Sequence, residues 1–405
     1  MQIVPETRYL IGDLRTGKIT AYFGALSASW SDRLNTSETI DVSIDLQDKN
    51  LQNLDFLTLA TPCKAFLGVA EGSKILAAGP IWRATYNRDQ RTLDLSAKGM
   101  HSYFDHRHIL PLLALTIAVT SFAIASGSKT VPNPALASSY SGLSLGTIAK
   151  RLVQQARLWT GGNVPIVFQA DESGIHTRTY DGLDFKNLGE TLTQISQVDN
   201  GPDINFQPRF TSDNLSVEWL FQTGTNAQPF IASASTHVWD LTVPKSPVSE
   251  LTIDRDGSRI GSLAWVTGGR STDQVLVARS YLSALVDAGF PLYEVLDTSH
   301  STVDLQSTLN SYAQELVGIG RSPIDTWSFK VESRPTDELG NPAGPQIDQI
   351  SVGDFSNMIV APFDPVKQTG DPDIPGGTYR NRIIGLSGDR QNTQISVQCA
   401  PVQGA

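Results

Sequence analysis

The segment YRNRIIGLSGDRQNTQISVQCAP, residues Tyr379 to Pro401, lies almost at the end of the 405-residue chain. Apolar and polar residues alternate on both sides of a polar turn, which is the pattern of a β-hairpin. The segment contains no recognisable catalytic motif, no cluster of metal ligands and no phosphate-binding loop. It therefore predicts a C-terminal β-hairpin that has a structural role rather than a catalytic one.

The first hundred residues carry the same β pattern. Ile40, Val42 and Ile44 alternate with polar residues, and the run KAFLGVAEGSKILAAGPIW (64–82) predicts a hairpin that turns at 71–74. Residues 85–99 and 385–399 both show a strand, a polar turn and an alternating strand. We therefore expect two similarly built β modules, one near each end of the chain.

Four segments between these modules have the spacing of amphipathic helices. The first, 144–159, begins at Ser144 as N-cap, and the second covers 184–200. A second helical pair is predicted at 273–288 and 302–316, where Ser301 and Asp304 resemble a capping box.

These elements predict an α+β fold class, with two β-barrel modules and intervening mixed α/β domains. The predicted domains are 1–105, an N-terminal β-barrel module; 106–210, an α/β domain with an apolar loop and two helices; 211–270, returning strands that complete the first barrel or bridge; 271–330, an α/β domain with the second helical pair; and 331–405, a C-terminal β-barrel module.

The composition restricts the function classes. The formal charge of −10 argues against a groove that holds DNA tightly, because such a groove needs clustered Lys and Arg. It is compatible with DNA that slides past a negative wall. Two cysteines, Cys63 and Cys399, exclude a disulfide scaffold and are expected to be buried small hydrophobic residues. The N-terminus shows no secretion signal.

The run ILPLLALTIAVTSFAIA, residues 109–125, has no charge across its 17 residues. This length is at the lower limit for a membrane-spanning helix, and Pro111 lies inside the run. Its β-branched and hydroxyl residues favour a buried strand pair or a docking loop instead. We expect an apolar contact surface here and no stable membrane insertion.

Three groups of residues match parts of catalytic or metal-binding motifs. Ser144 is the serine of a G-x-S-x-G match, but the residues before it predict a loop and Ser144 suits a helix N-cap. Ser126 and Lys129 match S-x-x-K inside a Gly/Ser loop. His101, His106 and His108 form the third group, beside Asp105 but without an evident further ligand. We therefore predict no catalytic, cofactor-binding or metal-binding residues, no cofactor and no enzymatic activity.

Several segments together resemble the tail hub proteins, also called minor tail or baseplate hub proteins, of long-tailed bacteriophages that infect actinobacteria. The segments that carry the resemblance are AAGPIWRATYN (77–87), SAKGMHSYFDHRHIL (96–110), SGLSLGTIAKRLVQQARLWTGGNVPIVF (141–168), NGPDINFQPRF (200–210), VARSYLSALVDAGFPLYE (277–294) and RNRIIGLSGD (380–389).

The resemblance implies two β-barrels related to the tail-tube subunit, with α/β domains outside them. It implies a homotrimer whose six barrels match a six-fold tube, in the virion at the distal end of the tail. The implied partners are a distal tail protein or the last tail-tube ring, tip and fibre proteins, tape-measure protein in the lumen, and DNA only in transit. The alternatives are a tail-tip cell-wall hydrolase or esterase that uses Ser144 or the three histidines, and a β-protein that binds host-surface carbohydrate.

Overall fold

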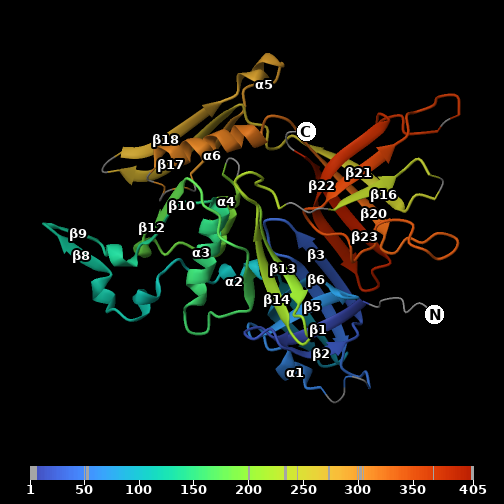
Figure 1. Ribbon diagram of the computed structural model, residues 1–405, viewed down its shortest axis with the longest axis horizontal. Helices are drawn as coiled ribbons and strands as arrows, with labels where there is room; N and C mark the ends of the chain where they lie inside the picture. Colours follow the sequence, from blue (N-terminus) through green and yellow to red (C-terminus); the bar gives the residue numbers. More distant parts are fainter. Residues whose placement is uncertain are drawn as a thin grey trace.

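The computed structural model describes residues 7–49, 51, 54–198, 201–231, 235–243, 245–271, 274–298, 300, 303, 305–367 and 369–402. The chain is built mainly from antiparallel β structure, with a small number of helices grouped on one side of it (Figure 1). The short helix at residues 56–59 lies apart from the other helices, beside the N-terminal strands.

The first seven strands form an N-terminal module. Their bounds are β1 (Thr7–Asp13), β2 (Ile19–Phe23), β3 (Ser27–Arg33), β4 (Thr39–Asp45), β5 (Ala65–Glu71), β6 (Lys74–Asn87) and β7 (Thr92–Lys98), with the short helix α1 (Phe56–Leu59) between β4 and β5. β5 and β6 pair as the predicted hairpin, and β4 pairs with β7. The long strand β6 pairs with β5 over its first half and with β7 over its second, so it carries the chain from one layer to the other.

A C-terminal module contains β15 (Thr236–Asp240), β16 (Val248–Asp256), β20 (Ile324–Glu332), β21 (Phe355–Val360), β22 (Gly377–Asp389) and β23 (Gln394–Pro401). β22 and β23 are the hairpin predicted at the end of the sequence. β22 also pairs antiparallel with β3, from Gly385 opposite Arg33 to Asp389 opposite Ser29. Hydrogen bonds between these two strands therefore join the modules into one sheet.

This shared sheet differs from the two separate barrels that the sequence predicted for 1–105 and 331–405. Along the main strand order the described sheet runs from β16 to β2, and neither module forms a closed barrel within the described strands. In the N-terminal module the physical reason is the β3–β22 pairing: β3 is an edge strand of that module, and its free edge pairs with the C-terminal module rather than with β2 at the other edge.

Two hydrophobic cores lie on opposite faces of β1 and β5. Ile11 and Leu67 point into a core shared by the two modules, which also contains Trp239, Phe329 and Val397. Their sequence neighbours Leu10 and Phe66 point into a second core, together with the helices. Burial on both faces explains why residues 65–70 form an unbroken apolar run rather than an alternating one.

The second core holds a mixed α/β region. Its elements are α2 (His101–Phe104), β10 (Ser138–Leu143), α3 (Leu145–Arg157), β11 (Ile166–Phe168), β12 (His176–Tyr180), η4 (Gly182–Asp184), α4 (Leu188–Ser196), β13 (Ile204–Phe210) and β14 (Val217–Thr223). The helix predicted at 144–159 is confirmed as α3. The helix predicted at 184–200 is shorter than expected, because Asn187 rather than Asp184 caps its start.

The helix predicted at 273–288 is wrong. Residues Gln274–Tyr281 form strand β18, and only Ser283–Asp287 are helical, as α5. β18 pairs with β17 (Leu263–Ser271), which pairs on its other side with β19 (Glu294–Asp297). The helix predicted at 302–316 is found as α6 (Gln306–Ile319), and it packs on this small sheet. Ser301 and Asp304 of the predicted capping box lie outside the described residues.

The apolar run 109–125 does not form the buried strand pair that was one of its two predicted structures. It contains two 3-10 turns, η1 (Leu112–Leu115) and η2 (Val119–Ser121), and the start of β8 (Ala123–Ser126), which pairs with β9 (Lys129–Pro132) before η3 (Pro134–Leu136). Most of its apolar side chains are exposed. Among the described residues, no helix combines the length and the apolar character needed to span a membrane.

Candidate functional site

Ser144 stands at the junction of β10 and α3, so a strand does precede it where the sequence predicted a loop. Its backbone is ordinary and extended (φ −68°, ψ 156°), and its side chain is buried. Its Oγ accepts a hydrogen bond from the Thr147 N–H at 3.1 Å and donates to Thr147 Oγ1 at 3.0 Å. These contacts confirm Ser144 as the N-cap of α3.

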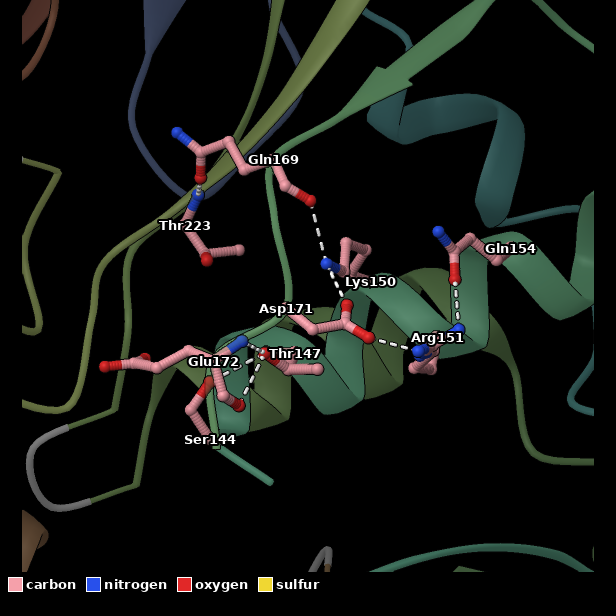
Figure 2. A network of polar contacts seen from close by, with 9 residues as sticks. All are labelled: Ser144, Thr147, Lys150, Arg151, Gln154, Gln169, Asp171, Glu172 and Thr223. Atoms are coloured by element: carbon pink, nitrogen blue, oxygen red, sulfur yellow. Dashed lines mark hydrogen bonds and ion pairs between the residues drawn. The ribbon is translucent and has the colours of Figure 1, made fainter. Parts of the chain in front are cut away.

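Figure 2 shows that the surroundings of Ser144 bind the start of α3 to the segment 169–172. Thr147 Oγ1 donates to the Glu172 carbonyl at 3.0 Å and accepts from the Glu172 N–H at 2.8 Å. Lys150, whose side chain is buried, donates to the Gln169 carbonyl at 2.8 Å and forms an ion pair with Asp171. The hydrogen bond from Lys150 lowers the pKa of Asp171. Every polar group described here has a structural partner.

The three histidines have three different environments. His101 is buried and meets the Phe206 ring edge to face at 6.1 Å, and burial lowers its pKa. His106 is exposed and lies on the Trp82 ring at 4.5 Å, whereas His108 is held through its backbone by a bridge to Asn187. Within the described ranges, no group of three or more His, Cys, Asp and Glu side chains is placed to hold a metal ion.

The remaining reactive residues are the S-x-x-K pair and the two cysteines. Ser126 and Lys129 are paired residues at the exposed turn of the β8–β9 hairpin. Cys399 is buried as expected, and burial raises the pKa of its thiol to about 12. Cys63 is exposed, so the expectation that both cysteines are buried was wrong for Cys63. Its backbone has φ of 62° in the turn before β5.

The most connected polar site lies where the two β modules meet the segment around β13. Asp203, just before β13, forms an ion pair with Arg382 of β22. The same carboxylate accepts from Asn35 Nδ2 at 2.9 Å and from the Ile231 N–H at 2.9 Å. Arg382 also lies over the Phe230 ring at 5.2 Å. This clamp links residues from three distant parts of the chain at one largely buried point.

A second set of contacts also links the two β modules. Glu71 at the end of β5 accepts from Arg334 at 2.7 Å and from Thr7 Oγ1 at 2.6 Å. Trp30 of β3 donates to the Asn392 side chain of the β22–β23 turn at 2.7 Å. Thr7, Glu71, Arg334 and Asn392 border an open groove of about 950 Å³ between the modules.

A smaller polar cavity of about 190 Å³ lies inside the same junction. Asp32 of β3 and Lys74 of β6 line it, and Lys74 donates to Ser351 Oγ at 2.8 Å and to the Ile350 carbonyl. Asp32 Oδ1 is buried without a hydrogen-bond partner. Burial raises the pKa of Asp32 to about 7, and the Lys74 ammonium opposes that shift.

Sequence reasoning did not identify the clamp, because Asp203 and Arg382 are 179 positions apart. Both lie inside segments that carry the family resemblance, 200–210 and 380–389. That resemblance was the only signal that singled these segments out, since an isolated Asp and an isolated Arg carry no motif.

No family model matches the chain, and no curated protein is similar to it in sequence. Two solved structures match it almost from end to end. One is the tail protein from Neisseria meningitidis MC58, with a TM-score of 0.52 and 13% identity, covering 98% of this chain and 96% of that chain. The other is the 43 kDa tail protein of prophage MuSo2 from Shewanella oneidensis, with a TM-score of 0.51 and 12% identity, covering 98% of each chain.

The likeness lies in the fold, since so few residues are identical. It includes both β modules and the α/β region between them, because 98% of the chain is matched in each case. The fold is therefore that of phage tail proteins, in agreement with the broader part of the sequence-based resemblance.

Proposed function

We propose that this chain is a structural protein of a bacteriophage tail, and that it forms the hub at the distal end of the tail. The observation that carries the proposal is the fold match along 98% of the chain to two phage tail proteins. The resemblance of individual segments to the hub proteins of actinobacteriophages is the reason for proposing the tail hub rather than another tail protein.

The hub is a homotrimer that surrounds a channel. Each copy supplies two tail-tube-like β modules, so three copies present six modules to a six-fold tube. The modules are joined in each copy through the β3–β22 pairing and the Asp203–Arg382 clamp, which keep their relative orientation fixed. Because the copies are related by a rotation axis, the same contact between neighbouring copies repeats until the ring is closed.

The hub joins the last tail-tube ring, or a distal tail protein, to the tip and fibre proteins. Tape-measure protein occupies its lumen before ejection, and DNA passes through it. The formal charge of −10 supports this transit role, because a negative wall repels phosphate and lets DNA slide without binding.

The alternative of a cell-wall hydrolase or esterase receives no support from Ser144, whose Oγ is engaged by Thr147. A turnover assay on peptidoglycan and on ester substrates tests it directly, with Ser144→Ala as the control. An activity that the wild-type chain shows and this variant loses would replace the hub assignment with an enzymatic one.

The hub proposal is tested by reconstruction of phage particles with a labelled chain. We expect three copies at the distal tail end, surrounding the channel. Label along the tail tube, in the capsid or on free fibres, or a copy number other than three, would refute the hub.

A further inference from the structure

One face of the small sheet β18-β17-β19 is covered by α6, and its other face is open. Ala264, Val266 and Ala278 point to the covered face and are buried with Leu309 and Ala313 of α6. Residues next to them in sequence point the opposite way, because side chains alternate along a strand. The exposed side of an antiparallel sheet is normally polar.

Here the open face is apolar and aromatic. Trp265 is paired across the sheet with Arg279 on β18 and with Leu296 on β19, and Leu263 is paired with Tyr281. Paired residues share a face, so these side chains form one surface. We call it the outer face, and it consists of Leu263, Trp265, Thr267, Val275, Val277, Arg279, Tyr281, Glu294 and Leu296.

The outer face has the composition of a protein-binding surface. Leu296 is 66% exposed and Tyr281 is 54% exposed. Its two charged groups are turned to the central tryptophan: Arg279 lies over the Trp265 ring at 5.9 Å, and Glu294 accepts from Trp265 Nε1 at 3.1 Å. Tryptophan, tyrosine and arginine are the residues that dominate binding energy at protein interfaces.

A second apolar surface projects from the α/β region. It is the arm, residues 112–132, whose β8–β9 hairpin lies at the end of the molecule farthest from the C-terminal module (Figure 1). Val119 is 80% exposed and Leu115 is 58% exposed. Lys129 is the single charged residue between positions 109 and 149. An exposed apolar arm with a single charged residue is typical of a segment that is buried in an assembly.

The arm cannot reach the outer face of its own chain. Its two ends are fixed to the α/β region: Trp159 Nε1 donates to the Leu110 carbonyl at 3.1 Å, and Leu136 is fully buried. α6 lies on the side of the small sheet that faces α4 and β12, since Thr308 and Tyr312 line one cavity with Thr191 and Tyr180. The outer face is therefore turned away from the region that carries the arm.

We propose that the arm of one copy docks on the outer face of the next copy. This contact rests on the proposed ring of identical chains. A cyclic ring needs two different and complementary patches on every chain. The arm and the outer face provide such a pair, because one is an apolar projection with a single charged residue, Lys129, and the other is a largely apolar sheet whose two charged side chains both contact Trp265.

Analytical ultracentrifugation of the purified full chain tests the contact, because it measures the mass of the assembly that the chain forms. Val119→Asp on the arm and Leu296→Asp on the outer face each place a charge in the contact, and we expect each to raise the dissociation constant by at least about 30-fold. Both side chains are exposed in the single chain, so folding is retained. Leu339→Asp is the matched control, because Leu339 is 87% exposed in a loop of the C-terminal module; it leaves the mass unchanged.

Cross-linking identifies the two surfaces directly. Val119→Cys and Leu296→Cys are each made with Cys63→Ser, which leaves only the buried Cys399. With a short bismaleimide, a mixture of the two variants should link, and neither variant alone should link to itself. Linking of Val119→Cys to itself would show an arm-to-arm contact and overturn the proposal.

The possible outcomes distinguish failure of the proposed arm contact from failure of the proposed trimeric hub. A wild-type mass of three copies that both Asp variants retain, without a cross-link in the mixture, overturns the arm contact and leaves the ring intact. A cross-link in the mixture together with a mass other than three copies supports the contact and refutes the trimer. A monomer without any cross-link refutes both.

Discussion

Removal of the Arg382 side chain should lower the free energy of unfolding, because Arg382 lies where the two β modules meet. Arg382→Met leaves the Asp203 carboxylate largely buried, with Asn35 and the Ile231 N–H as its remaining donors. Breaking a buried ion pair costs about 3–5 kcal/mol. Since Asp203 keeps two donors, we expect the lower end, about 3 kcal/mol of the free energy of unfolding. Asp203→Ala should cost more, up to about 5 kcal/mol, because it also leaves Arg382 and Asn35 without their partner.

Urea unfolding followed by far-UV circular dichroism measures both changes. Because the clamp joins the modules, Arg382→Met should also split the transition or lower its urea dependence, which a local packing defect would not do. Lys245→Met is the control, since the Lys245–Glu338 pair is highly exposed and 3.5 Å apart, so its loss should have no measurable effect. If Arg382→Met unfolds at the same urea concentration as this control, the clamp does not hold the modules together.

Three further changes test individual elements. Ser144→Ala should destabilise the chain by about 1 kcal/mol through loss of the N-cap, whereas Ser144→Asp should keep most of it; equal urea midpoints for the two variants would contradict the capping role. Asp32, whose folded pKa is raised from 3.8 to about 7, binds its proton more tightly in the folded state, so it lowers stability as pH rises from about 4 to about 7, by at most ~1.4 kcal/mol per pH unit. Asp32→Asn should therefore gain stability relative to wild type as the pH rises from about 4 to about 7, and a constant difference in urea midpoint over this range would refute the reasoning. Gly79→Ala would place a Cβ 1.9 Å from the Lys98 carbonyl oxygen and should cost about 3 kcal/mol or more, whereas Gly24→Ala, with no atom within 4 Å, should be tolerated in the same thermal unfolding assay.

The sequence predicted the elements whose signals are local. β4 and β23 alternate because one face of each is buried. α3 was predicted because Ser144 and the apolar residues that follow it lie within one helix. The Asp203–Arg382 clamp and the β3–β22 pairing join residues that are far apart in the chain, and no local periodicity encodes such contacts. For the same reason, separate closed barrels were expected where the described strands form one shared sheet.

The error at 273–288 has a physical cause that bears on function. A strand with one solvated face alternates between apolar and polar residues, which makes it recognisable. In β18, Ala278 and Leu276 face α6, but Val275, Val277 and Tyr281 on the opposite face are apolar as well. The alternation is therefore absent, and the apolar residues at 275, 278, 282 and 285 imitate the spacing of a helix. A sequence that is apolar on both faces of a three-stranded sheet is expected where both faces are covered, one by α6 and the other by a neighbouring molecule. The misread strand and the exposed outer face thus have one explanation, which the cross-link between Val119→Cys and Leu296→Cys tests.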